Sequence, residues 1–194
     1  GRSLSISEDG HTVAIAVTHY GPPFHAGAAR IFTYDENNQS WSQSALIAGN
    51  QAEGYLAAPS LSPDGQSLAI TGFGYDQGFT DNGIVKLYKL NGGSWSDNGS
   101  FAGASHRDNL RSAEFSHDGS IVVLGAMNND QGGANAGLVQ VYEQVGGTWI
   151  QRGSNILGNP GDAIGFSLSI SAGLANRYLR FFSSFKLNIP SQLT

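Results

Sequence analysis

The chain has 194 residues, of which 40% are hydrophobic and only 13% charged, and its formal net charge is -5. The ten Lys and Arg residues are never adjacent, so no basic stripe is available to neutralise a phosphate backbone, and we expect no nucleic-acid partner. The absence of Cys excludes a disulfide framework, no run approaches the ~20 apolar residues that span a bilayer, and the 27 Gly residues favour many tight turns in an all-β chain.

The first segment predicts four consecutive strands. Residues 3–7 alternate between polar and apolar side chains, Asp9-Gly10 suits a type I′ hairpin turn, and residues 12–17 form a run of β-branched and small apolar side chains. A loop rich in Gly and Pro over residues 19–27 leads to a third strand at about 29–34. A fourth strand is expected to begin near Trp41.

The same unit then recurs along the chain. Trp41, Trp95 and Trp149 are separated by two intervals of 54 residues, and an Asp-Gly pair begins at Asp9, Asp64 and Asp118. A fixed period of this length predicts units that bury their apolar faces by stacking on one another. The second strand of each unit is apolar on both faces, as expected for a sheet that is covered on both sides.

These observations predict an all-β fold, a partial β-propeller of three four-stranded blades plus the start of a fourth. The predicted units are residues 1–53, 54–108, 109–162 and an incomplete unit with an anomalous tail at 163–194. That tail is either a capping segment or sequence that did not evolve with the repeats. Three blades leave two open faces, so we expect the chain to be a fragment of a longer protein and to self-associate in isolation.

The repeated landmarks GFSLSIS, HTVAIAV, NGIVKLY, GLVQVY and GGTWIQ resemble the FG-GAP repeat family over about residues 1–171. The resemblance implies a propeller like that of integrin α-chains and a role at the cell surface. A distant WD-repeat or TolB-type propeller is the alternative, since the SPDG sequence at 62–65 is common there too.

The FG-GAP resemblance also implies a calcium loop of the DxDxDG kind, but the turns here read EDG, PDG and HDG. Calcium needs six to eight oxygen ligands, so we expect these turns to bind none. A weaker candidate is the loop with Asn128 and Asp130, for which a solvated polar loop is the alternative. His19 and His25 share a loop, but the sequence places no third zinc ligand beside them.

No residue pattern of catalysis stands out. The sequence has no GxSxG nucleophile elbow, and the serines that alternate with apolar residues resemble strand filler. Carboxylates such as Asp35, Asp97 and Glu143 have no recurring partner. We therefore predict no catalytic, cofactor or metal residues.

The long polar loops of each unit are expected to converge on one end of the propeller, where binding residues tend to lie. This predicts a non-enzymatic recognition or adhesion module, extracellular or at the cell surface, that binds a protein or glycan. The rivals are a propeller hydrolase whose active site lies in blades outside this sequence, and a purely structural array; an acid cluster at the axis favours the enzyme. The predicted ligand-binding residues, for which packing of the loops is the alternative role, are Tyr20, Phe24, Tyr75, Asp76, Phe79, Asn128 and Asp130.

Overall fold

The computed structural model describes residues 3–170 and 179–182, and this part of the chain contains fifteen β-strands and no helix. The first sheet has the order β1 (Leu4–Ile6), β2 (Thr12–Val17), β3 (Ala28–Asp35) and β4 (Ser40–Ala48). The second has β5 (Leu56–Leu61), β6 (Ser67–Gly72), β7 (Ile84–Asn91) and β8 (Ser94–Ala102). The third has β9 (Leu110–Phe115), β10 (Ile121–Ala126), β11 (Leu138–Val145) and β12 (Thr148–Gln151), with β13 (Ile156–Leu157) also paired to β11. Last, β14 (Ser167–Ile170) pairs with β15 (Leu179–Phe182).

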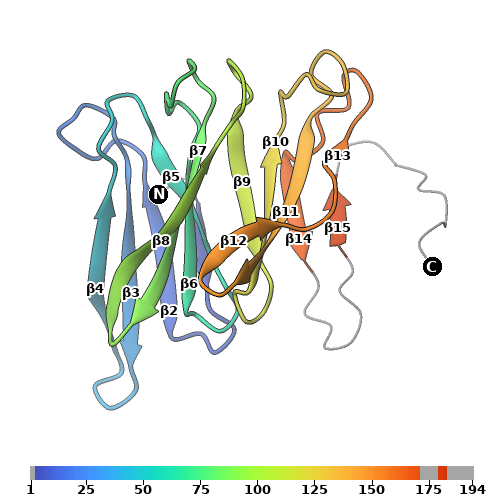
Figure 1. Ribbon diagram of the computed structural model, residues 1–194. Coiled ribbons are helices and arrows are strands. Elements are labelled where there is room, and N and C mark those ends of the chain that lie inside the picture. The colour runs from blue at the N-terminus through green and yellow to red at the C-terminus, as the bar shows by residue number, and fades with distance from the viewer. Residues whose placement is uncertain (1–2, 171–178, 183–194) are drawn as a thin grey trace, which may run out of the picture.

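The three large sheets stand side by side, and each is an antiparallel meander (Figure 1). Their first strands, β1, β5 and β9, contact one another in that order, and β14 continues the series against β9. The first strands therefore lie innermost, and β4, β8 and β12 lie at the outer edges. This arrangement confirms the predicted partial propeller of three four-stranded blades and the start of a fourth.

The core lies between neighbouring sheets. One cluster joins the first two sheets through Ile31, Leu68 and Ile70, and a second joins the next pair through Leu87, Phe115 and others. Strands β6 and β10 are buried along their whole length, as their two apolar faces require. No helix in the described part of the chain is long and apolar enough to cross a membrane.

The turn between the first two strands differs from the prediction. Gly10 is left-handed with φ 74°, but Asp9 is not, so the turn is not type I′. Instead the Gly10 N–H donates to the Ser7 carbonyl at 3.0 Å, which closes a type I turn followed by a left-handed glycine. The reason is the Asp9 carboxylate, which accepts from the Ser7 hydroxyl at 2.5 Å and the His11 N–H at 2.9 Å. These bonds hold residues 8–11 in a four-residue turn between Ser7 and Thr12, whose backbones are hydrogen-bonded to each other.

The same Ser-x-Asp-Gly turn recurs in the other sheets. Ser62 donates to Asp64 at 2.5 Å, and Ser116 donates to Asp118 at 2.7 Å. Burial raises the pKa of Asp118, but hydrogen bonds from Ser116 and Ser120 outweigh it and lower that pKa to about 2. The aspartates of these turns thus hold the turns themselves.

The outer strand of the third sheet is interrupted, unlike its counterparts. β4 and β8 each run for nine residues, whereas β12 has four and β13 only two. Between them lies Gly153, with φ 77°, whereas the corresponding Gly99 of β8, with φ 112°, lies at a register shift through which that strand continues.

Each long loop is hydrogen-bonded to the connection that leads to the next sheet. The Leu110 N–H donates to the Asn82 carbonyl at 3.0 Å, and the Gly103 N–H donates to the Gly83 carbonyl at 3.2 Å. The first and third sheets repeat this pair of bonds, from Leu56 to Ala26 and Gly49 to Gly27, and from Ile164 to Ala136 and Gly158 to Gly137. The long loops gather at the upper end of Figure 1, opposite the Ser-x-Asp-Gly turns.

Candidate functional site

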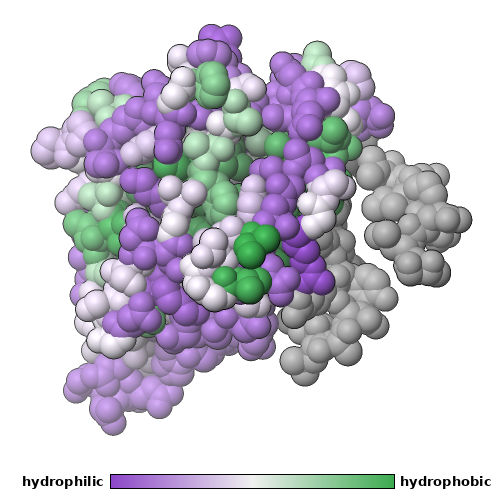
Figure 2. Space-filling view, in the orientation of Figure 1, coloured by the Kyte–Doolittle hydropathy of each residue, from purple (hydrophilic) through white to green (hydrophobic). Residues whose placement is uncertain are grey.

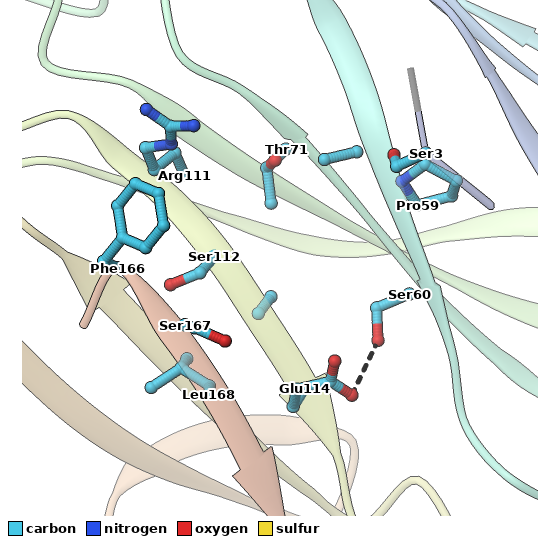
Figure 3. A pocket seen from close by; sticks show the side chains of 12 residues that line it. Ser3, Pro59, Ser60, Thr71, Arg111, Ser112, Glu114, Phe166, Ser167 and Leu168 are labelled. Carbon is cyan, nitrogen blue, oxygen red and sulfur yellow. Dashed lines mark hydrogen bonds between the residues drawn. The ribbon is translucent and has the colours of Figure 1, made fainter. Parts of the chain in front are cut away.

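The innermost strands enclose a pocket of about 180 Å³ at the propeller axis. Residues of β5, β9 and β14 line it, together with Ser3 next to β1. Figure 3 shows Glu114 and Ser60 facing each other across the gap between β9 and β5, with Arg111 and Phe166 together at the other end of the pocket. The pocket is therefore built from four successive blades.

Serine hydroxyls join these innermost strands. The Ser5 hydroxyl accepts from the Leu61 N–H at 2.9 Å, and the Ser112 hydroxyl donates to the Gly165 carbonyl at 2.5 Å. Ser60 donates to Glu114 at 3.1 Å. The interpretation of the alternating serines as strand filler is wrong for Ser5 and Ser60, because both link one blade to the next.

Glu114 is the carboxylate of this pocket. Burial raises the pKa of the Glu114 carboxyl, and the hydrogen bond from Ser60 acts in the opposite direction. The sequence analysis did not single out Glu114. The signal that marks it is its place in the repeat, because Ser60 stands 54 residues earlier where the third unit has Glu114.

A β-bulge positions Arg111 at the end of the pocket near the long loops. Leu110 pairs with Ala126 and Ser112 pairs with Gly125, so Arg111 is the extra residue of the bulge. Bulges re-aim side chains in this way. The Arg111 guanidinium lies over two rings, 5.9 Å from the Phe73 centroid and 5.2 Å from that of Phe166.

This arrangement combines a carboxylate of raised proton affinity, serine hydroxyls and a guanidinium around one small space. Such groups bind hydroxyl-bearing or carbonyl-bearing ligands, and the carboxylate is able to act as a general base. The acid cluster that would favour an enzyme is only partly present, because one carboxylate, Glu114, lies among the residues that line this pocket. Across the described residues no three His, Asp or Glu side chains lie where they could hold a metal ion together.

The predicted ligand-binding residues lie on three successive long loops. In the first loop, Tyr20 is half-buried and its carbonyl accepts from the Gly27 N–H at 3.2 Å. Phe24 is 64% exposed, and its ring centroid lies 3.6 Å from that of His25. Phe24 is thus available at the surface, whereas Tyr20 is part of the loop's own packing.

In the second loop, the Tyr75 hydroxyl donates to Asn50 at 2.5 Å. Asp76 accepts from the Asp81 N–H at 2.7 Å, which closes the loop. Phe79 is 41% exposed and contacts the His106 ring edge-on at 5.1 Å. Of these three residues, Phe79 is the one that presents an apolar surface.

In the third loop, the half-buried Asn128 donates its backbone N–H to the Asp108 carbonyl at 3.2 Å. Asp130 accepts from the Asn135 N–H at 2.7 Å, which matches Asp76 in the previous loop. The hydrogen bonds of these residues therefore lie within their own loops or with an adjoining connection, and Tyr75 also packs against the core between the first two sheets. That is the packing role that the sequence left as the alternative, and ligand binding by these residues stays a prediction.

No protein-family model matches the chain, and no curated protein matches its sequence. The FG-GAP resemblance therefore stays a prediction. Solved structures do resemble the fold. The periplasmic gluconolactonase PpgL of Pseudomonas aeruginosa superposes with a TM-score of 0.64 at 17% identity, over 98% of this chain and 58% of that one.

Two further structures extend the comparison. A Bacteroides fragilis protein, whose assignment as a 6-phosphogluconolactonase is provisional, matches with a TM-score of 0.54 at 15% identity, over 81% of this chain and 39% of that one. The complex of KlAtg21 with the coiled coil of AgAtg16 matches with a TM-score of 0.62 at 12% identity, over 93% of this chain and 50% of that one. The likeness shows the fold, and the chain spans about two fifths to three fifths of these structures.

Proposed function

We propose that this chain forms part of a propeller hydrolase of the lactonase type, whose substrate binds at the axial pocket. The observation that carries the proposal is Glu114, a carboxylate with raised pKa that lies in a pocket with Arg111 and Ser60. The likeness of the fold to gluconolactonase structures supports the proposal, because the names of those structures give the enzyme alternative a specific reaction to test. This departs from the non-enzymatic role that the sequence favoured.

In such a reaction Glu114 acts as general base on a water molecule. Water attacks the lactone carbonyl, the carboxylate takes its proton, the ring ester bond breaks, and the ring oxygen leaves as a hydroxyl after protonation. A raised pKa makes the Glu114 carboxylate a stronger base, and Arg111 offers hydrogen-bond donors to substrate oxygens at the mouth of the pocket.

The test is hydrolysis of D-glucono-δ-lactone, followed by proton release in a pH-stat. We expect a rate above the spontaneous one, and a loss of about 100-fold in Glu114→Gln, the lower range for a general base. Glu36→Gln is the matched control, because Glu36 lies exposed beside His11 at the far edge of the first sheet. No acceleration by the chain, or equal rates for the two variants, would contradict the proposal.

The second candidate function is recognition through the long-loop face. In this role the chain would be an extracellular adhesion module that binds a protein or glycan. The observation in its favour is that Phe24 and Phe79 are exposed on loops held by backbone hydrogen bonds. Exposed aromatic anchors on a rigid frame supply binding energy at low entropic cost. A glycan and protein array probed with the chain and with the Phe24→Ala/Phe79→Ala double variant tests it, and equal signals for both would reject this face.

A further inference from the structure

A second cavity, of about 240 Å³, lies between the second and third sheets beneath the long loops. Its lining includes Asp108, Tyr142 and four amide side chains (Asn129, Gln131, Gln140 and Asn155). None of these residues belongs to the axial pocket. The cavity was not predicted from the sequence.

The equivalent place between the first and second sheets is filled by a tyrosine. A Cβ added to Gly54 would lie 3.0 Å from the Tyr75 ring, so the ring covers that glycine. The Tyr75 hydroxyl reaches Asn50 at 2.5 Å, and Lys86 lies over the ring at 5.2 Å. A ring, an amide and an ammonium together occupy this junction.

One repeat of 54 residues later, each of these positions carries a different side chain. Asn129 stands where Tyr75 would be, Asp108 replaces Gly54, and Gln140 replaces Lys86. Ala104 stands in the place of Asn50. The loss of the ring opens the cavity, and the substitutions line it with polar groups.

These polar groups are held in place by their own hydrogen bonds. Asp108 is only 2% exposed, and its Oδ2 accepts from the Ser105 N–H at 2.8 Å and from Asn129 at 3.1 Å. Gln140 donates to the Asn155 oxygen at 3.0 Å, and Asn155 donates to the Gln131 oxygen at 2.9 Å. These two hydrogen bonds occupy the side-chain oxygen of Gln131 and the side-chain nitrogen of Gln140.

The Gln131 nitrogen and the Gln140 oxygen are therefore left to donate and to accept at the cavity wall. The cavity lining holds no Lys or Arg, so nothing there attracts an anionic group. Tyr142 packs on Phe101 at a centroid distance of 4.3 Å and presents an aromatic surface. Amides beside an aromatic ring match the alternating hydroxyl and C–H surfaces of a sugar.

We propose that this cavity is a binding site for a neutral, hydroxyl-rich ligand of monosaccharide size. Its volume is below the ~300 Å³ at which pockets for drug-sized ligands begin, which sets this upper size. The proposal does not depend on the axial pocket, because the two sites share no lining residue.

The test uses D-glucose and D-galactose, titrated into the ¹⁵N-labelled chain while the side-chain amide resonances are followed. We expect saturable shifts at Gln131, Gln140 and Asn155 with at least one sugar, with Kd on the order of 1 mM. Glucose 6-phosphate should bind at least about tenfold more weakly, because the only charged lining group, Asp108, is a carboxylate. Tighter binding of the phosphate, or no shifts with either sugar, overturns the proposal.

Asn129→Tyr is the main variant, because it copies the residue that fills the neighbouring junction. It should abolish the amide shifts, whereas Glu114→Gln at the axis should leave them unchanged. Gln140→Lys copies a second residue of that junction and removes the free acceptor, so it should weaken sugar binding more than tenfold. This second variant keeps the proposal testable if Asn129→Tyr fails to fold. Shifts that persist in a folded Asn129→Tyr or in Gln140→Lys would also overturn the proposal.

Discussion

Glu114 links the pH dependence of stability to the axial pocket. Its pKa in the folded chain lies above the ordinary value because the carboxyl is buried. The native state therefore binds more protons than the unfolded state between the two pKa values, and stability falls as pH rises through the folded one.

Glu114→Gln should remove this contribution. As the pH rises above the ordinary carboxyl pKa of 4.5, the free energy of unfolding of the parent chain should decline relative to that of Glu114→Gln, as measured by urea denaturation at each pH. Asp81→Asn, at an exposed carboxylate on the second long loop, serves as the control. Parallel curves for the parent chain and Glu114→Gln would show that burial does not perturb this group.

Gly83 shows how closely the chain approaches itself at a junction. Its φ is 78°, and an added Cβ would lie 2.4 Å from the Leu110 carbonyl oxygen. Gly92 is also left-handed, with φ 56°, but has nothing within 4 Å. Gly83→Ala should cost at least about 3 kcal/mol in urea denaturation, against about 1 kcal/mol for Gly92→Ala, since only the first adds a backbone clash. Similar losses for the two variants would mean that left-handed strain alone sets the cost.

At the scale of elements, the recurring tryptophans connect each outer strand to the preceding sheet. The Trp149 indole N–H donates to the Asn98 carbonyl at 2.9 Å, and Trp149 packs on the core cluster that includes Phe115. Trp95 packs in the same way on the cluster between the first two sheets. Trp41 lies in the first sheet of the described residues and is 47% exposed.

The three tryptophans should therefore differ in their effect on stability. Trp149→Ala should cost about 3 kcal/mol, the low end for a large aromatic because the ring is half-buried, whereas Trp41→Ala should stay within about 0.5 kcal/mol. Chemical denaturation of both variants measures the difference. Equal losses would show that the indoles act within their own sheets.

For the whole molecule, the open face of the first sheet is the feature that bears on assembly. Leu4 and Ile6 on β1 are 65% and 52% exposed, although they lie on an innermost strand. Figure 2 shows a mostly hydrophilic surface with separate hydrophobic patches, one of them over the β11–β12 hairpin, where Val145 and Ile150 are exposed.

We expect the isolated chain to self-associate through the face of the first sheet. Leu4→Thr/Ile6→Thr should raise the dissociation constant more than about tenfold, because each apolar side chain contributes about 1.5 kcal/mol or more when buried. Light scattering over a concentration series measures this, with Val145→Thr as a control on another surface. A monodisperse monomer of the parent chain at all concentrations would contradict the expectation.

The sequence predicts those parts of the fold that depend on local patterns. Alternation, Asp-Gly turns and the recurring Trp residues are readable along the chain, and they locate the strands and the stacked sheets. The prediction of a type I′ turn was wrong, because the turn depends on a hydrogen bond from a serine two residues before the aspartate, as between Ser7 and Asp9. Of the predicted incomplete unit and tail, residues 171–178 and 183–194 lie outside the described residues.

The pockets were beyond the sequence analysis because each depends on the difference between copies of one unit. Glu114 in place of a serine, and Asn129 in place of Tyr75, are single substitutions in a polar background. The role of each substitution depends on a residue from outside its own strand or loop: Ser60 contacts Glu114, and Asp108 contacts Asn129. A pattern that describes what the copies share does not contain this information.

The bonds that hold each long loop to its connection run between main-chain atoms, so they are indifferent to most side-chain identities. Loop tips such as Gly78, with open space around it, can therefore vary or lengthen without loosening the contact between blades, while the loop base at Gly83 cannot. A library randomised at the tips and constant at the bases would keep the architecture and change only what the surface recognises.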